Sequence, residues 1–227
     1  MKTQTEITIE TLNEDFKVFS TMLLKQFHLT NSLFEADHAH RMETMKTIMD
    51  HEHIVDGLEV KMREEIVRSI VLYCPRAGDL RKIMAYYDLS SYLERIGDLL
   101  MNVAEFIGDL HSEKKEILLF RRNLKEFLEL SENMVQNAIF AFSCEDSLLA
   151  KETIRRDDSA DTLHSKIITG LKNEINFPIQ AEELTDIINM SAMSYNLERI
   201  SDHATNIAES ALFLMEGKNV KHTNLDI

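Results

Sequence analysis

Acidic side chains recur in this sequence at a fixed offset. The string LERIGDLLMNVAE at residues 93–105 returns as LERISDHATNIAE at residues 197–209, with eight of thirteen positions identical. The identical positions include three carboxylates, Glu94, Asp98 and Glu105, which return as Glu198, Asp202 and Glu209. A repeat that keeps polar groups as well as apolar ones predicts a pair of equivalent sites.

A second acidic pair precedes each copy of the string. Glu52 and Asp56 precede the first copy, and Asp157 and Asp161 precede the second. Residues four apart on a helix lie one turn apart on the same face, where two like charges cost roughly 0.2–0.5 kcal/mol if nothing neutralises them. We therefore expect each half of the chain to gather four carboxylates that favour a bound cation.

Carboxylate and amide oxygens are suited to hard ions such as Mg²⁺, Ca²⁺, Mn²⁺ or iron, and several carboxylates can bridge more than one metal. Further residues continue the acidic stripes or lie one turn beyond the second pairs, and they are candidates for additional ligands: Glu59, Asn102, Glu105, His164, Asn206 and Glu209. The alternative is a solvated helix face, on which Arg95 and Arg199 neutralise nearby carboxylates as surface ion pairs.

Composition indicates that helices position these residues. The 227 residues include only six Gly, two Pro and no Trp, so helix breakers are few and an all-α fold is expected. Breaks at Pro75, Gly108, Cys144 and Pro178 separate long helical patterns. They predict six helices, at residues 8–34, 37–73, 79–108, 113–142, 147–175 and 181–216.

Short loops between long helices force consecutive helices to run antiparallel. The sequence therefore predicts two tandem three-helix bundles, residues 1–109 and residues 110–227. Apolar residues in the first repeated string recur at intervals of three and four and form a buried seam. At 100° per residue, Glu94, Asp98, Asn102 and Glu105 fall within an arc of about 80° on the opposite face. The second string reproduces both faces.

Charge and composition exclude several classes of protein. The net charge of −14 argues against non-specific binding to nucleic acid or to an anionic membrane surface. Two cysteines in no paired motif argue against a disulfide framework or a thiolate zinc site. The first residues lack the plan of a signal peptide, and no apolar run approaches the roughly 20 residues that span a bilayer. We expect a soluble, cytoplasmic protein that does not insert into membranes.

Taken together, these motifs resemble the PhoU family. The resemblance consists of L-E-R-I-x-D followed by N-x-x-E, twice, each copy preceded by an E/D-x-x-x-D helix and a turn that contains proline; the first turn continues as Pro75-x-x-x-Asp79-Leu80-Arg81. It covers nearly the whole chain. It implies two three-helix bundles whose E/D-x-x-x-D motifs can hold multinuclear iron or zinc clusters.

The resemblance also implies a cytoplasmic regulator rather than an enzyme. PhoU proteins act with a phosphate ABC transporter and a sensor histidine kinase, restraining phosphate uptake and keeping the starvation response off when phosphate is plentiful. The resemblance places this chain at the inner membrane through these partners, and we expect a homo-oligomer such as a dimer. Ser201 replaces the usual glycine of the second motif, so we expect the two sites to differ. A divergent branch that serves another phosphate transporter is an alternative.

Two other functions stay open at this point. One is a metal-dependent hydrolase or oxidase that uses the carboxylate cluster as a di-metal centre. The other is a protein that stores or buffers metal ions. The sequence contains no nucleophile elbow, phosphate-binding glycine loop or dinucleotide fingerprint, so an adaptor that signals through changed association is the leading hypothesis.

Overall fold

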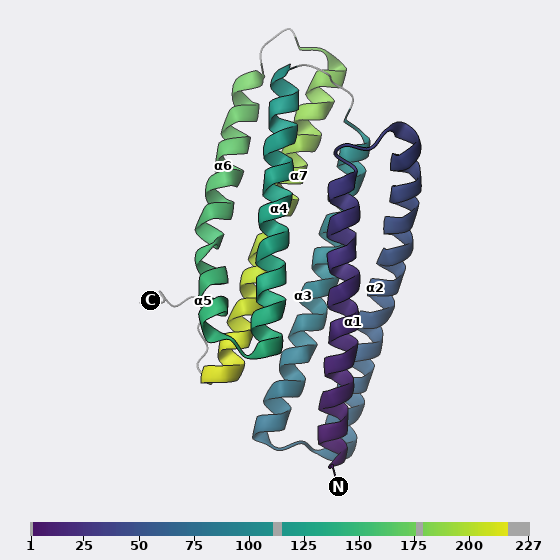
Figure 1. The fold of residues 1–227 in the computed structure, drawn as a ribbon, viewed down its shortest axis with the longest axis vertical. Coiled ribbons are helices and arrows are strands. Elements are labelled where there is room, and N and C mark those ends of the chain that lie inside the picture. The colour runs from purple at the N-terminus through teal and green to yellow at the C-terminus, as the bar shows by residue number, and fades with distance from the viewer. Residues whose placement is uncertain (1, 111–114, 176–178, 218–227) are drawn as a thin grey trace.

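The regular structure of the chain is α-helical throughout the part that the computed structural model describes, residues 2–110, 115–175 and 179–217 (Figure 1). Seven helices follow one another in these residues: α1 (Gln4–Ser32), α2 (His38–Tyr73), α3 (Ala77–Gly108), α4 (Lys115–Cys144), α5 (Ser147–Arg155), α6 (Asp157–Glu174) and α7 (Ala181–Glu216). The predicted all-α fold of two three-helix bundles is confirmed.

One predicted helix consists of two. The pattern at 147–175 is interrupted at Arg156, which separates α5 from α6, although the two remain in line in Figure 1. The interruption is slight because Arg156 keeps right-handed helical dihedral angles and its amide still bonds to the carbonyl of Glu152 at 3.2 Å. The predicted start of the fourth helix at residue 113 and the break at Pro178 lie outside the described residues.

The helix ends follow from local side chains. Thr3 and Glu6 form a capping box at the start of α1, and Asp146 accepts hydrogen bonds from two amides at the start of α5. Such caps satisfy amides that have no partner within the helix. Cys74 ends α2 in the left-handed conformation (φ 43°), directly before Pro75, which cannot continue the helix.

Each bundle has an apolar interior built largely by the repeated strings. Leu93 and Ile96 of α3 are fully buried in the first bundle, and their equivalents Leu197 and Ile200 of α7 are fully buried in the second. Large aromatic side chains such as Phe27 and Phe127 fill the space beside them. The predicted apolar seam of each string is therefore the core of its own bundle.

The two bundles pack side by side, with α3 along α7 and α1 against α4 (Figure 1). An aromatic cluster joins them: the ring of Phe142 on α4 lies 5.3 Å from Phe16 on α1 and 5.4 Å from Tyr86 on α3, measured between centroids. Edge-to-face aromatic contacts of this kind stabilise by about 0.5–1.5 kcal/mol beyond their buried area. The bundles therefore share one continuous core.

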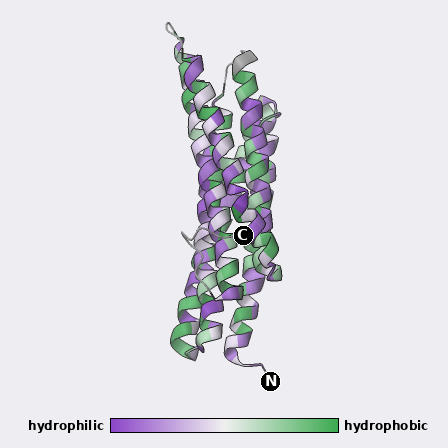
Figure 2. Ribbon diagram, turned by 90° about the vertical axis from the view of Figure 1, so that its left-hand side faces the viewer, coloured by the Kyte–Doolittle hydropathy of each residue, from purple (hydrophilic) through white to green (hydrophobic). Residues whose placement is uncertain are grey.

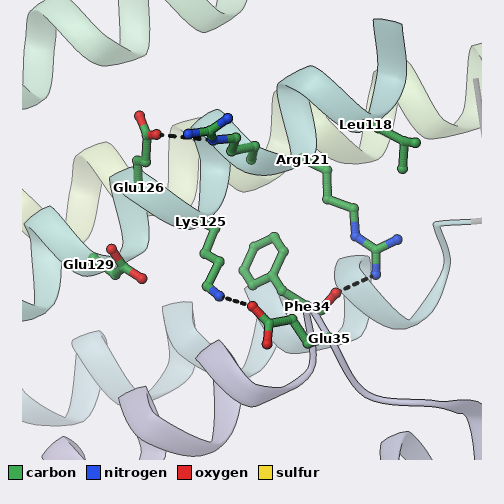
Figure 3. A pocket seen from close by; sticks show the side chains of 8 residues that line it. Phe34, Glu35, Leu118, Arg121, Lys125, Glu126 and Glu129 are labelled. Atoms are coloured by element: carbon green, nitrogen blue, oxygen red, sulfur yellow. Dashed lines mark hydrogen bonds and ion pairs between the residues drawn. The ribbon is translucent and has the colours of Figure 1, made fainter. Parts of the chain in front are cut away.

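A polar contact joins the same two bundles near the other end of α1. Arg121 of α4 donates a hydrogen bond to the carbonyl oxygen of Phe34 at 2.9 Å, and Lys125 forms an ion pair with Glu35 (Figure 3). These residues line a pocket of about 490 Å³. Because the arginine bonds to backbone, this contact fixes the position of the chain where it leaves α1.

The outer surfaces of the helices are mixed in polarity. Figure 2 shows hydrophilic and hydrophobic residues interleaved along the helices on the side of the molecule that it presents. No helix in the described residues is both long enough and apolar enough to cross a membrane.

The burial of the apolar seam predicts how substitutions change the free energy of unfolding. Leu93→Ala removes a fully buried side chain from the α3 seam, and we expect it to lower the free energy of unfolding by about 2–5 kcal/mol. Leu148→Ala is the matched control because Leu148 is 79% exposed, and we expect a change within about 0.5 kcal/mol. Urea denaturation followed by circular dichroism measures both. Equal effects of the two substitutions would contradict the assignment of the core.

Candidate metal centres

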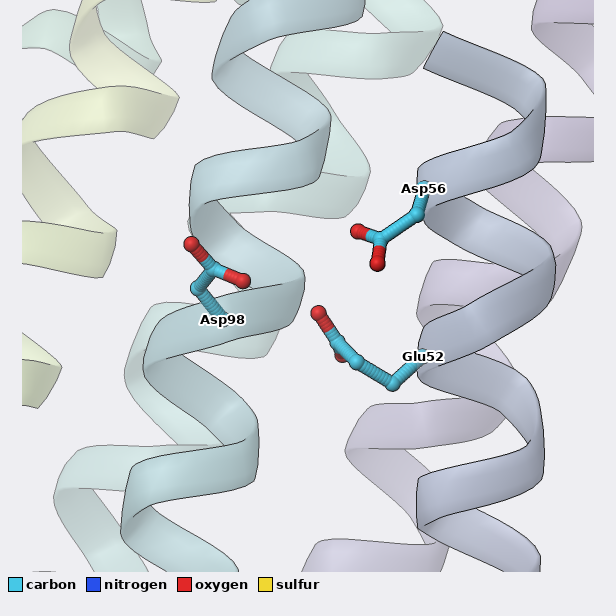
Figure 4. A group of neighbouring side chains, drawn as sticks. All are labelled: Glu52, Asp56 and Asp98. Atoms are coloured by element: carbon cyan, nitrogen blue, oxygen red, sulfur yellow. The ribbon is translucent and has the colours of Figure 1, made fainter. Parts of the chain in front are cut away.

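Three carboxylates from two helices converge at the contact between α2 and α3. Glu52 and Asp56 reach from α2 and Asp98 reaches from α3, and one oxygen atom of each lies within 4.8 Å of the others (Figure 4). The fourth predicted member, Glu94, lies one turn away on α3, where it is half-buried and feels the charges of Asp98 and Asp56. The first acidic cluster, as we name Glu52, Asp56 and Asp98, thus joins both predicted pairs.

The first acidic cluster is held by a glutamine from the third helix of the bundle. Gln26 of α1 is fully buried, and its amide nitrogen donates to Oε2 of Glu52 at 3.1 Å and to the carbonyl oxygen of Gly97 at 3.2 Å. A Cβ atom on Gly97 would lie 3.2 Å from Val55 and 3.5 Å from Oε2 of Glu52. The glycine therefore permits the close approach that places Glu52 beside Asp98.

Burial and like charge both resist ionisation in this cluster. Burial raises the pKa of Glu52 to about 7; the hydrogen bond from Gln26 opposes the rise, and the neighbouring Asp98 and Asp56 carboxyls add to it. Burial also raises the pKa of Glu94, with Asp98 as the next cause. The cluster therefore holds negative charge at a free-energy cost near neutral pH, which a bound cation would offset.

Unpartnered oxygen atoms at this position fit a cation. Oε1 of Glu52 and Oε1 of Gln26 are both buried without a hydrogen-bond donor. A buried acceptor without a donor costs about 1–3 kcal/mol, and a metal ion supplies the missing electrophile. The chemistry of the donors, carboxylate and amide oxygens only, suits Mg²⁺, Mn²⁺, Ca²⁺ or iron better than a soft metal.

The second acidic group lies at the equivalent place between α6 and α7. Burial raises the pKa of Asp157 to about 6, and the charges of Asp202 and Asp161 contribute. Asp202 has a raised pKa chiefly through burial, then through Glu198 and Asp161, while Arg199 opposes the shift. These four carboxyls are neighbours, but among the described residues they do not form a group of three as tight as the first acidic cluster.

The difference between the two groups has a structural cause. Ser201 stands where the first repeat has Gly97, and it is fully buried against Ser131 of α4, with 3.1 Å between the two hydroxyl oxygens. Among the described residues, it is Thr205 of α7 that donates to a carboxylate of this group, at 3.3 Å from Oδ1 of Asp157. The hydrogen bond to Asp157 of α6 thus comes from α7, the helix that carries Asp202, whereas Glu52 of the first acidic cluster is bonded by α1.

A cleft lined by both acids and arginines lies beside the first acidic cluster. Its volume is about 530 Å³, and Arg95 of α3 and Arg199 of α7 both line it, together with Glu94 and Asp98. Arg95 and Arg199 are equivalent residues of the two repeats, and they meet because α3 and α7 run antiparallel (Figure 1). Residues of both duplicated strings therefore line one cleft.

Arg95 and Arg199 influence the ionisable groups around them. Within the described residues, neither Arg95 nor Arg199 has a carboxylate within ion-pair distance. Their charges act at longer range: Arg95 opposes the raised pKa of Glu94, and Arg199 opposes that of Asp202. The pKa of His203 is lowered to about 4, first by burial and then by these two guanidinium groups. The ring of His203 lies 5.9 Å from that of Tyr92, measured between centroids, so a neutral imidazole packs beside this tyrosine.

The remaining predicted ligands lie at varying distances from the acidic groups. Glu59 pairs with Arg63 at 3.3 Å at the edge of the cleft, and Asn102 lines the same cleft. His164 is engaged elsewhere, with Nδ1 3.0 Å from the hydroxyl oxygen of Ser194. Glu105 and Glu209, on the later turns of the strings, do not join a group of three acidic, histidine or cysteine ligands among the described residues, and Asn206 is half-buried on α7.

Sequence reasoning missed two residues that shape these groups. Gln26 was recognisable as a polar residue on the apolar face of α1, next to the fully buried Phe27. Thr205 lies within the repeated string but at a position where the first copy has Met101, so the repeat itself gave no signal. Both act by hydrogen bonding to a carboxylate that the sequence did identify.

Comparison with known proteins agrees with this geometry. The model of the PhoU domain matches the chain twice, at residues 17–107 and 124–211, which include both repeated strings and both acidic groups. The chain belongs to the PhoU family. It is 34% identical over 191 residues to the phosphate-specific transport system accessory protein PhoU homolog of Aquifex aeolicus, which covers 84% of this chain and 85% of that protein.

Other PhoU proteins match over greater lengths. A PhoU homolog of Zymomonas mobilis with the same descriptive name is 28% identical, covering 97% of this chain and 94% of its own. The crystal structure of PhoU from Pseudomonas aeruginosa superposes with a TM-score of 0.85 at 25% identity, covering 95% of this chain and all of that one. PhoU from Streptococcus pneumoniae gives a TM-score of 0.79 at 20% identity, which shows the shared fold.

The raised pKa of Glu52 predicts how stability depends on pH in metal-free protein. The folded-state pKa, about 7, exceeds the ordinary value of 4.5, so wild type loses stability as pH rises from 4.5 through 7. Glu52→Gln keeps a neutral side chain, so we expect its stability relative to wild type to increase over that range. Thermal denaturation in chelator at several pH values measures this difference.

Glu14→Gln is the control because Glu14 is exposed on α1. Its difference from wild type should not change across the same pH range. If Glu52→Gln behaved like Glu14→Gln, the Glu52 carboxyl would not be held against ionisation.

Proposed function

We propose that this PhoU protein is a metal-loadable adaptor of phosphate transport. In this role it associates with a phosphate ABC transporter and a sensor histidine kinase at the cytoplasmic side of the membrane, and it restrains uptake and the starvation response when phosphate is plentiful. The observation that carries the proposal is the convergence of Glu52, Asp56 and Asp98 around buried, unpartnered oxygens. Relatives named as accessory proteins of the phosphate-specific transport system support it.

The first acidic cluster is the better metal site of the two. Its three carboxylates come from two helices, Gln26 orients one of them, and the desolvation of Glu52 favours neutralisation. The eight residues proposed to hold metal are those of the E/D-x-x-x-D motifs: Glu52, Asp56, Glu94, Asp98, Asp157, Asp161, Glu198 and Asp202. The family resemblance favours clusters of iron or zinc ions. The carboxylate oxygens can also bind Mg²⁺, Mn²⁺ or Ca²⁺.

Charge gives these groups a way to control association. Each acidic group includes exposed carboxylates, Asp56 and Asp98 in the first and Asp161 and Asp202 in the second, which are available to basic side chains of a partner. A bound cation supplies positive charge that changes this surface. The carboxylates then present a different potential to the same partner, which alters the rate and strength of association without bond chemistry.

Metal binding can be tested by titration of metal-free protein. We expect Asp98→Asn to lower the affinity for Mn²⁺ about 10-fold or more, because it removes the only carboxylate that α3 gives to the cluster. Asp50→Asn is the matched control, an exposed residue on α2 outside the cluster. Calorimetric titration measures both. Equal Mn²⁺ affinity in the two variants would contradict the proposed first site.

Partner association can be tested by capture from membranes. Immobilised protein is incubated with membranes that contain the phosphate transporter and the kinase, from cells grown at high and low phosphate. We expect Asp98→Ala with Asp202→Ala to lose most of the transporter that wild type retains, while the exposed pair Asp50→Ala with Asp158→Ala retains it. Quantitative immunoblotting of both components provides the measurement.

The outcomes separate the alternatives. Capture by wild type that the acidic substitutions leave unchanged would contradict a role for these faces. Metal-dependent hydrolysis or redox turnover that Asp98→Ala abolishes would indicate an enzyme, and many tightly held ions without any captured partner would indicate storage.

A further inference from the structure

The cleft beside the first acidic cluster is lined by arginines from both bundles. Arg95 reaches it from α3 and Arg199 reaches it from α7, and the cleft has a volume of about 530 Å³. Within the described residues, neither guanidinium group forms an ion pair or a hydrogen bond with the protein. Two positive charges that line one cleft repel each other, so an anion bound between them would be stabilised.

Neutral hydrogen-bond donors lie on the same face of α3 as Arg95. Ser91 is four residues before Arg95 and Asn102 is seven residues after it, and both line the cleft. Residues at these spacings share one face of a helix. The cleft thus offers a hydroxyl, an amide and two guanidinium groups, a set of donors that suits the oxygen atoms of a tetrahedral oxyanion.

The lining of the cleft favours a small inorganic anion over a nucleotide. In the described part of the chain the lining side chains include no aromatic ring, and their one apolar member, Leu99, is only 4% exposed. A nucleotide base binds best where it can stack on an aromatic ring or lie against apolar side chains. Phosphate needs only donors and positive charge, which this cleft supplies.

Carboxylates in the same cleft oppose an anion unless they are neutralised. Glu59 is already paired with Arg63, with 3.3 Å between the charged atoms. Glu94 and Asp98 also line the cleft, and both are among the residues proposed to hold metal. A cation in the first acidic cluster would offset their charge, so the two unpaired arginines would then dominate the electrostatic potential of the cleft.

We propose that this cleft binds inorganic phosphate between Arg95 and Arg199, and that metal in the first acidic cluster strengthens this binding. The arginine pair does not require the metal, whereas the coupling rests on the proposed metal-loadable function. Coupling between two ligands is reciprocal, so phosphate strengthens metal binding by the same factor. The protein would therefore respond to phosphate directly, through the charge of the cleft and of the acidic surface beside it.

Equilibrium dialysis with radiolabelled inorganic phosphate tests the arginine pair. In the presence of Mn²⁺ we expect wild type to bind phosphate saturably, and Arg95→Gln or Arg199→Gln to weaken binding about tenfold or more, because each removes a charged donor. Arg68→Gln is the matched control, at an exposed arginine of α2 outside the cleft, and it should bind like wild type. Circular dichroism checks that each variant is folded.

Two results would overturn the phosphate site. One is the absence of phosphate binding to Mn²⁺-loaded wild type at millimolar phosphate. The other is equal phosphate affinity in Arg95→Gln, Arg199→Gln and Arg68→Gln. Competition with ATP tests the class of ligand: if ATP displaced the labelled phosphate at a lower concentration than unlabelled phosphate does, the assignment to inorganic phosphate would be wrong.

Titration in both directions tests the coupling. We expect Mn²⁺ to tighten phosphate binding about tenfold, and saturating phosphate to tighten Mn²⁺ binding by the same factor. Asp98→Asn removes a charge that opposes the anion, so in chelator it should bind phosphate more tightly than wild type does. Equal phosphate affinity of wild type with and without Mn²⁺ would contradict the coupling.

The same measurements distinguish a failure of this proposal from a failure of the proposed function. Binding of Mn²⁺ without any binding of phosphate would leave the metal-loadable adaptor intact and overturn the phosphate site. Binding of phosphate that Arg95→Gln and Arg199→Gln weaken, in a protein that binds no Mn²⁺, would support the arginine pair and contradict both the coupling and the metal site.

Discussion

The close approach of α2 to α3 at Gly97 is the constraint on which the first acidic cluster depends. Without a side chain at that position, Val55 and Glu52 lie directly against the α3 backbone, and Gln26 bridges the contact from α1. The same contact removes water from Glu52 and brings it beside Asp98, which raises its pKa. Packing within the bundle therefore raises the free energy of the ionised Glu52 carboxylate, and a bound cation would offset this cost.

A single substitution in the duplicated string changes this constraint. Ser201 in place of glycine makes a hydroxyl contact with Ser131 of α4, and Asp157 accepts its hydrogen bond from Thr205 of α7. The two halves share a fold and a sequence motif, but they differ in how tightly they gather carboxylates. Duplication conserved the positions of the acids, and the neighbouring small residue determines how closely they meet.

Much of the architecture could be predicted from the chain alone. The apolar spacing around Leu93 and Leu197 identifies the buried seams, and the in-phase pairs Glu52–Asp56 and Asp157–Asp161 indicate which helices meet. The meeting of Arg95 with Arg199 could not be predicted, because it depends on how one bundle packs against the other. The partner of Gln26 was equally inaccessible: its place on the apolar face of α1 could be recognised, but its hydrogen bond to Glu52 joins distant helices and leaves no periodic pattern.

The central claim is that the first acidic cluster is built to hold a cation. Anomalous X-ray diffraction from crystals grown with Mn²⁺ tests it most directly, because the scatterer reports its own position. The account predicts an anomalous peak among Glu52, Asp56 and Asp98, with Oε1 of Glu52 as a ligand. Anomalous peaks elsewhere in the molecule, with none among these three carboxylates, would contradict it.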